Sequence, residues 1–166
     1  AACFELTISQ NNTPCALLLS RQGVPVLNKN LDFVIDGVSK GAYSILDCDN
    51  PELIFIATGS EVSLALEVAE KMSDKKIRVI SMPCREIFEQ QSDDYKNSII
   101  PNRGAMKISM EAGITMGWEK YIGVNGLSIG IDHYGASAPG KDLSEEFGFT
   151  SEKVENKIRD HLSKLL

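Results

Sequence analysis

A short apolar run that ends in an arginine is the first place where this sequence offers a group suited to chemistry. The run Ala16–Leu19 is followed by Ser20, Arg21 and Gln22, and its length and aliphatic composition predict a short buried strand. In open α/β sheets, ligands bind beyond the carboxyl ends of the strands, where a guanidinium can hold a phosphate through two parallel hydrogen bonds. The alternative is a solvent-facing Arg21 that only marks the end of the strand, since most surface arginines bind nothing.

A Gly-Ser turn is a second candidate for an anion site. The stretch IATGSE, residues 56–61, is predicted to join a strand to a helix, where backbone N–H groups favour an anion. It lacks the spaced glycines of a dinucleotide loop and the Gly-Lys pair of a P-loop. The sequence therefore favours a tight turn in which Ser60 caps the next helix and Glu61 complements the helix dipole.

The histidines and carboxylates do not form a recognisable catalytic pair. His133 follows a predicted strand, and Asp132 points to the other face if that strand is regular, so we interpret His133 as a local structural or surface residue. His161 is interpreted as a surface or interface residue of the last helix. The stretches EQQSDD and SEEFG are interpreted as solvated helix faces, and no metal-ligand spacing is present in the sequence.

The composition is that of a globular domain. The 166 residues are 43% hydrophobic and 24% charged, with a formal net charge of −6. Lysines and arginines are scattered, which predicts no nucleic-acid partner, and no stretch is long enough to predict a membrane span. Four separated cysteines predict free thiols in a reducing, cytoplasmic compartment. The first residue is Ala1 in a helix-like segment, so we expect a longer parent protein.

Strand and helix patterns alternate along most of the chain. Residues 1–12 are predicted to end a helix, and residues 23–41, without sustained periodicity, are predicted to be a linker. Strands are predicted at 15–20, 42–47, 52–60, 76–83, 105–111 and 127–132. Helices are predicted after Ser60, within 84–100, over 117–123, and from Thr150 or Ser151 onward. The alternation predicts an α/β three-layer domain over residues 42–166, with a mixed, mostly parallel sheet and helices on both faces.

Several stretches match a known family in order and spacing. They are LLLSRQ, PELIFIATGSEVSLALEVAEKM, RVISMP, EAGITMGWEKYIG, IDHYGASAPGKDLSEEFGFT and the closing helix. Over essentially its whole length, the chain resembles the carboxyl-terminal part of transketolases. The most specific pieces are the ATGSE turn, GWEKY, and GxSAP followed by EEFGFT.

The resemblance implies a role for each part of the chain. Transketolases have three α/β domains: the first binds the diphosphate of thiamine diphosphate and its divalent metal (Mg or Ca), and the second binds the aminopyrimidine. By resemblance, residues 1–22 are a remnant of the second domain, 23–41 are the linker, and 42–166 are the C-terminal domain. Strand 42–47 is then expected to run opposite to its neighbours. Arg21 matches the SRQ arginine that binds the phosphate of sugar phosphates, although Gly23 replaces the Asn common after that motif.

The resemblance also implies the activity of the intact protein. Transketolases are cytoplasmic homodimers of the pentose phosphate pathway that transfer a two-carbon ketol unit between ketose and aldose phosphates. The metal-diphosphate motif and the activating glutamate are expected before residue 1. The resemblance therefore implies no catalytic, cofactor-binding or metal-binding residue in this chain, and no activity of the chain alone.

Two other interpretations stay open from the sequence. One is a stand-alone α/β binding or scaffold module, against which residues 1–22 argue, because such a module would not keep an orphan strand that ends in Arg21. The other is a related enzyme such as dihydroxyacetone synthase, which the C-terminal domain does not distinguish. The length of the encoded polypeptide separates module from enzyme, since three domains of about 100–200 residues each predict a much longer parent.

Overall fold

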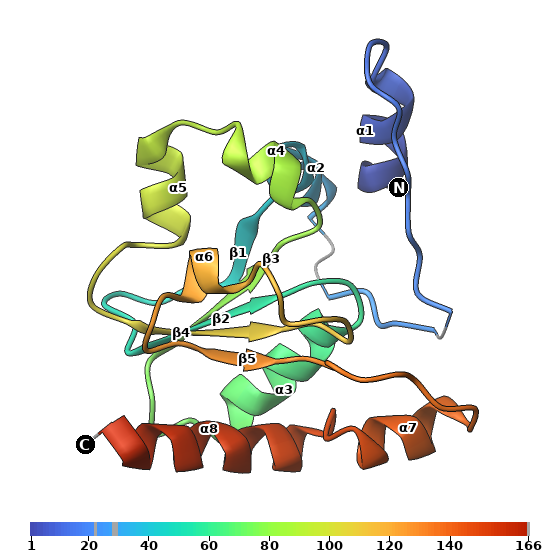
Figure 1. The fold of residues 1–166 in the computed structure, drawn as a ribbon. Helices are drawn as coiled ribbons and strands as arrows, with labels where there is room; N and C mark the ends of the chain where they lie inside the picture. Colours follow the sequence, from blue (N-terminus) through green and yellow to red (C-terminus); the bar gives the residue numbers. More distant parts are fainter. Residues whose placement is uncertain (22, 28–29, 166) are drawn as a thin grey trace.

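Five strands form one mixed sheet at the centre of the protein (Figure 1). The structure, a computed structural model, describes residues 1–21, 23–27 and 30–165. The strands are β1 (Tyr43–Leu46), β2 (Leu53–Ala57), β3 (Ile77–Ser81), β4 (Met106–Met110) and β5 (Leu127–Ile129), in the order β1-β3-β2-β4-β5. All neighbouring pairs are parallel except β1 and β3. The predicted mixed, mostly parallel sheet is confirmed, and so is the opposite direction of the strand predicted at 42–47.

The central strand β2 is buried on both faces. Each of its residues is at most 2% exposed, as its continuous apolar sequence LIFIA requires. Because successive side chains leave a strand on opposite faces, Phe55 packs in one hydrophobic core and Ile54 and Ile56 pack in the other. Leu53 aligns with Ile77 of β3 and with Met106 of β4, which fixes the register of the three central strands.

Helices cover both faces of the sheet, as predicted. The α3 helix (Glu61–Lys71) and the α8 helix (Ser151–Leu165) lie on one face, and α4 (Arg85–Glu89), α5 (Asp93–Ile99) and α6 (Glu119–Ile122) lie on the other (Figure 1). An additional short helix, α7 (Gly140–Glu146), precedes α8. The α3 helix buries Val62, Ala65, Val68 and Ala69, close to the apolar face expected from its helical spacing.

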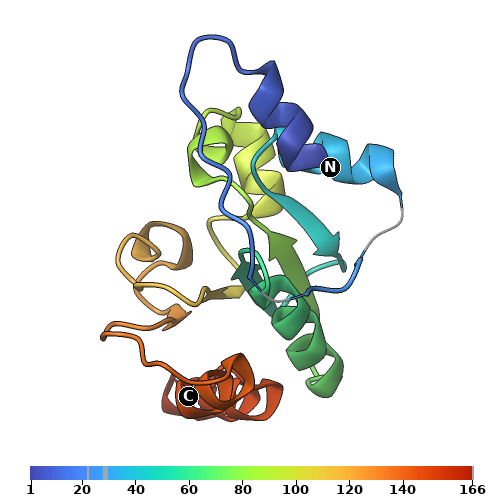
Figure 2. The same cartoon turned by 90° about the vertical axis from the view of Figure 1, so that its right-hand side faces the viewer.

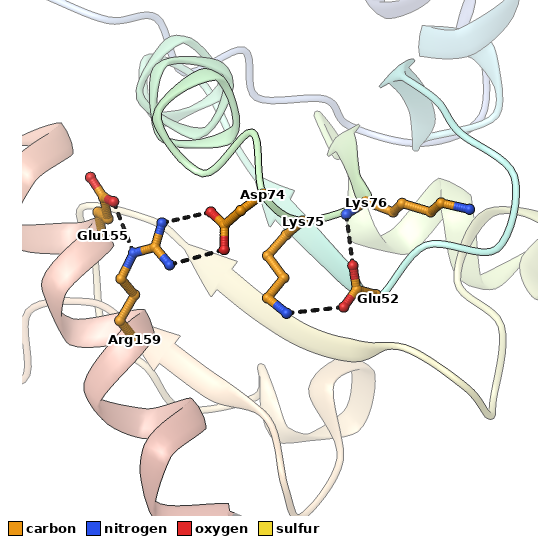
Figure 3. A network of polar contacts seen from close by, with 6 residues as sticks. All are labelled: Glu52, Asp74, Lys75, Lys76, Glu155 and Arg159. Atoms are coloured by element: carbon orange, nitrogen blue, oxygen red, sulfur yellow. Dashed lines mark hydrogen bonds and ion pairs between the residues drawn. The ribbon is translucent and has the colours of Figure 1, made fainter.

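An arginine holds α8 against the loop that follows α3 (Figure 3). Arg159 donates two hydrogen bonds to Asp74, of 2.8 and 3.2 Å, and its Nε donates to Glu155 at 2.9 Å. The hydrogen bond from Arg159 holds the pKa of Asp74 below its usual range. Beside this pair, the Lys76 backbone N–H donates to Glu52 at 3.0 Å. These groups are largely exposed, so they orient the helix more than they stabilise the fold.

The first part of the chain differs from the sequence-based expectation. The predicted helix end within residues 1–12 is confirmed as α1 (Ala2–Ser9), but α2 (Leu31–Ser39) forms inside the stretch 23–41 that we predicted to be a linker without helix. The Asn30 side chain accepts a hydrogen bond from the Phe33 backbone N–H at 3.1 Å, which caps α2. Both helices pack with β1 around Tyr43 in a small separate core.

The strand predicted at residues 15–20 is wrong for this structure. Residues 14–20 have no helix or strand assignment, and Leu18 and Leu19 are 88% and 79% exposed. A strand needs a neighbour for its backbone N–H and C=O groups, and none of the five described strands pairs with this segment. The segment instead runs extended along the side of the sheet (Figures 1 and 2).

Gly41 provides a test of the close approach between α4 and the start of β1. Its φ is +81°, and a Cβ atom placed on it would lie 2.4 Å from the Cys84 carbonyl oxygen and from the Phe88 amide nitrogen. We expect Gly41→Ala to lower the free energy of unfolding by about 3 kcal/mol or more, because left-handed strain and a backbone clash act together. Urea denaturation measures this loss.

Gly148→Ala is the matched control for backbone strain alone. Gly148 has φ +80° but open space where a Cβ atom would lie, so its substitution should cost only about 1–2 kcal/mol. Equal losses for the two variants would show that the approach of α4 to Gly41 is not as tight as described.

Candidate functional site

The carboxyl ends of the parallel strands bring the distinctive sequence stretches to one edge of the sheet. The arrowheads of β2, β4 and β5 point to the same side in Figure 1. The ATGSE turn follows β2, the stretch with GWEKY follows β4, and IDHYGASAP follows β5. Stretches far apart in the sequence are therefore neighbours at the edge where α/β proteins bind their ligands.

Glu111, the first residue after β4, connects these segments. Its Oε2 accepts a hydrogen bond from Trp118 Nε1 at 2.8 Å, and its Oε1 accepts one from Thr58 Oγ1 at 3.4 Å. The Arg85 guanidinium lies 4.0 Å from Glu111 Oε2. We name these four residues together with Glu61 the carboxyl-edge cluster.

The cluster fixes loops and does not form a reacting centre. Trp118 is 1% exposed, and the Arg85 guanidinium stacks on its ring at 5.0 Å from the centroid. Glu61 accepts from the Ala112 backbone N–H at 3.2 Å and from the Ser60 hydroxyl at 2.8 Å. Ser60 occupies the N-cap position of α3, as predicted, but makes no side-chain capping hydrogen bond. The start of α3 is therefore held against the loop after β4.

Asp132 and His133, which the sequence did not predict to act as a pair, follow the end of β5. Asp132 accepts hydrogen bonds from the Thr115 backbone N–H at 2.8 Å and from its hydroxyl at 2.8 Å, and the backbone bond, above all, lowers the pKa of Asp132. His133 Nδ1 lies 2.8 Å from the Tyr134 carbonyl oxygen, and its ring packs edge-on against Phe147. Among the described residues, no hydrogen bond or ion pair joins these two side chains, and the ring nitrogen of His133 meets the Tyr134 carbonyl instead.

Arg21 lies on an exposed bend near this same edge. The Ser20 hydroxyl is the nearest heavy atom to a Cβ atom placed on Gly59, at 3.9 Å, so the segment passes the turn after β2 (Figures 1 and 2). Among the described residues, Arg21 has no hydrogen-bond or ion-pair partner. Its neighbour Gln22 lies outside the described residues. The guanidinium is thus open to a ligand that approaches the carboxyl edge.

The described residues contain no cluster of side chains suited to a metal ion. Within residues 1–21, 23–27 and 30–165, no group of three or more His, Cys, Asp or Glu side chains is placed to hold a metal ion. The cysteines are free thiols. In that same part of the chain, no helix is long and apolar enough to cross a membrane.

A comparison with known families shows to which family the chain belongs. Residues 41–150 match the transketolase-like TK C-terminal domain. This chain belongs to the transketolase family. Transketolase from Staphylococcus aureus (strain MW2) is 43% identical over 158 residues, which are 93% of this chain and 24% of the relative. The chain therefore spans about a quarter of the length of the curated transketolases that it matches.

Solved transketolase structures share the fold. A variant of transketolase from Pichia stipitis superimposes with a TM-score of 0.88 at 33% identity, covering 98% of this chain and 23% of that one. Another structure of the Pichia stipitis enzyme, in complex with sedoheptulose 7-phosphate, covers 78% of this chain and 19% of its own with a TM-score of 0.72 at 34% identity. The match over nearly the whole chain agrees with the sheet order and the two helical layers described above.

Glu111 and Trp118 lie in one of the stretches that resemble the family, but no role was predicted for either residue. A usable signal was present, since Glu111 is a carboxylate directly after a buried strand and Trp118 is the single tryptophan of the chain. The partners Thr58 and Arg85 lie 53 and 26 positions away from Glu111 along the sequence. Spacing alone does not predict such contacts.

The hydrogen bond between Glu111 and Trp118 predicts the effect of two substitutions. Glu111→Ala leaves the buried indole N–H without its acceptor, and should lower the free energy of unfolding by about 1–3 kcal/mol. Glu111→Gln keeps an acceptor oxygen and should lose less than half as much. Urea unfolding followed by the fluorescence of Trp118 measures both variants. Identical losses would mean that the acceptor contributes nothing and that the packing of the side chain accounts for the effect.

Proposed function

We propose that this chain is the C-terminal region of a transketolase, which transfers a two-carbon ketol unit from a ketose phosphate to an aldose phosphate. The observation that carries the proposal is the placement of Arg21. It has no described partner and lies where its segment passes the Gly59 turn, at the carboxyl edge of the sheet. Within the complete enzyme, Arg21 holds the terminal phosphate of the sugar, since a guanidinium matches phosphate geometry with two hydrogen bonds.

The relatives support a sugar phosphate as the substrate. Transketolase from Pichia stipitis has been solved in complex with sedoheptulose 7-phosphate, and the family match makes the same substrate class the natural choice for this protein. We infer that residues 1–22 belong to the pyrimidine-binding domain of the enzyme and that residues 42–166 form its C-terminal domain, with 23–41 between them. The apolar residues Leu18 and Leu19, which are exposed here, would then be covered by the rest of that domain.

Thiamine diphosphate and a divalent metal belong to other parts of the complete enzyme in this proposal. The described residues do not fit the divalent metal, because they offer no metal-ligating cluster. When bound, the cofactor supplies the covalent chemistry of ketol transfer. The proposed enzyme is a cytoplasmic homodimer, as expected from the family, and Arg21 contributes to it by binding and orienting the end of the sugar that does not react.

Arg21→Ala in the complete enzyme tests the proposed phosphate contact. Loss of one charge-assisted pair costs about 1.5–3 kcal/mol, which is roughly one to two decades in affinity. We expect KM for ribose 5-phosphate to rise accordingly while kcat changes less, because the contact lies far from the reacting carbon. Arg21→Lys should recover only part of the loss, because an ammonium lacks the two-pronged geometry.

Free ribose and a second arginine provide the controls for this experiment. The kcat/KM for free ribose should hardly change in Arg21→Ala, because free ribose has no phosphate for Arg21 to bind. Arg103→Ala removes an exposed arginine from the opposite end of the sheet, before β4, and should leave both acceptors unaffected. Equal fractional losses for ribose 5-phosphate and ribose in Arg21→Ala would end the claim for this residue.

The chain alone should not bind the cofactor together with its metal. We expect calorimetry of the 166-residue chain with thiamine diphosphate to give no saturable binding that depends on magnesium, because no cluster of the described residues can hold the metal and so contribute to the roughly −8 kcal/mol of a micromolar site. Magnesium-dependent saturable binding near micromolar would contradict the assignment of the cofactor site to other domains. It would leave the Arg21 claim to be judged by its own kinetic test.

A further inference from the structure

Lys107 is a buried lysine without a counter-ion in the described structure. It lies on β4 beside Ile54 of β2 and is 8% exposed. No described residue forms a hydrogen bond or an ion pair with its ammonium group. Lysines are almost never buried to this extent unless they are paired, because desolvation of an ammonium costs several kcal/mol. Among the described residues, no buried side-chain nitrogen or oxygen lacks a hydrogen-bond partner, so the unpaired ammonium nitrogen at the tip of this buried side chain still reaches solvent and is accessible to a ligand.

A pocket opens at the place where Lys107 is buried. Its volume is about 430 Å³, and residues of α4, α5, α6 and β4 line it. These helices lie on the face of the sheet opposite α3 and α8 (Figure 1). The polar residues that line it with Lys107 include Lys96, Asn97, Asn102 and Lys120. It sits toward the amino-terminal end of β4, whereas Arg21 lies near the carboxyl ends of the strands, so the two places are separate.

The ion pairs in the pocket leave one positive charge uncompensated. Lys120 lies 2.6 Å from a carboxylate oxygen of Glu89, and Lys96 lies 2.9 Å from one of Asp93. These two carboxylates are the only ones that line the pocket in the described part of the chain. Each already serves another lysine, so the ammonium of Lys107 is the excess charge.

The amide groups of the pocket add hydrogen-bond donors to this charge. Asn102 Nδ2 donates to Asn97 Oδ1 at 2.8 Å, which orients the Asn97 amide and leaves its nitrogen without an acceptor among the described residues. Burial lowers the pKa of Lys107, and no neighbouring carboxylate opposes this shift. Asn97 is exposed and Lys107 is buried, and because both line the same pocket, one ligand can contact both groups.

We propose that this Lys107 pocket is a binding site for a small phosphate-bearing anion, with Lys107 as its counter-ion and Asn97 as a donor at its rim. A phosphate group supplies the missing negative charge and several acceptor oxygens, and both an ammonium and an amide N–H bind such oxygens well. The pocket is large enough for a phosphorylated small molecule as well as for free phosphate. The site is independent of the proposed ketol transfer and of Arg21.

Calorimetric titration of the 166-residue chain with inorganic phosphate tests the site, with chloride used to hold the ionic strength constant. We expect saturable binding, and we expect Lys107→Met to weaken it at least tenfold. Lys71→Met is the matched control, because it removes the same charge from an exposed position at the end of α3 and should leave the Kd unchanged. In chloride alone, Lys107→Met should raise the Tm, because an apolar side chain of similar length replaces the unpaired ammonium.

Asn97→Ala is the second variant, which covers the case that Lys107→Met fails to fold. Asn97 is exposed on α5, and its loss should weaken phosphate binding severalfold. Binding that is absent from the wild type, or that falls equally in Lys71→Met and Lys107→Met, would overturn the proposal. So would phosphate binding that is lost in Arg21→Ala and kept in Lys107→Met, because the phosphate would then occupy the other place.

Discussion

The burial of β2 on both faces is the constraint on which the rest of the structure depends. Five consecutive apolar residues without exposed side chains need a helical layer on each side of the sheet. The same burial requires the chain to leave the sheet sharply at the end of the strand, and Gly59, with φ +54°, makes that turn possible. The turn brings α3 back across one face and leaves its own backbone at the carboxyl edge, where the segment of Arg21 passes.

The carboxyl-edge cluster turns this arrangement into a fixed surface. Glu111 joins the turn after β2 to the indole of Trp118, and Arg85 brings the start of α4 to the same point. Contacts of this kind connect segments that are far apart in sequence. They hold the loops in place. The edge thereby acquires a defined shape.

The strands and helices that could be predicted from the sequence are those whose own residues show the pattern. The apolar runs of β2, β3 and β4 and the periodicity of α8 each predict their element without reference to the rest of the chain. The strand predicted at 15–20 failed because a strand is defined by its neighbour, and Leu18 and Leu19 have none among the described strands. The α2 helix was not predicted, because the Gly and Pro residues nearby indicated a linker although Asn30 can cap a helix.

The two candidate sites also differ in whether the sequence predicts them. Arg21 was predictable, since a cation at the end of an apolar run and the SRQ motif are both visible in the sequence, although its phosphate role stays a prediction. The burial of Lys107 could not be predicted from the sequence. A parallel strand that is buried on both faces has no alternation of polar and apolar residues, so its sequence does not show whether a lysine points inward or outward. The lack of a partner for Lys107 also depends on the two carboxylates of the pocket. Asp93 pairs with Lys96 within α5, which local spacing allows, but Glu89 pairs with Lys120 only because α4 and α6 pack together.

The central proposal is that the carboxyl edge presents Arg21 to the phosphate of a sugar. The most direct measurement is a crystal structure of the complete enzyme with bound sedoheptulose 7-phosphate. We expect the Arg21 guanidinium to lie at hydrogen-bond distance, about 2.7–3.2 Å, from two phosphate oxygens. A bound phosphate held entirely by other residues, with Arg21 turned to solvent, would contradict it.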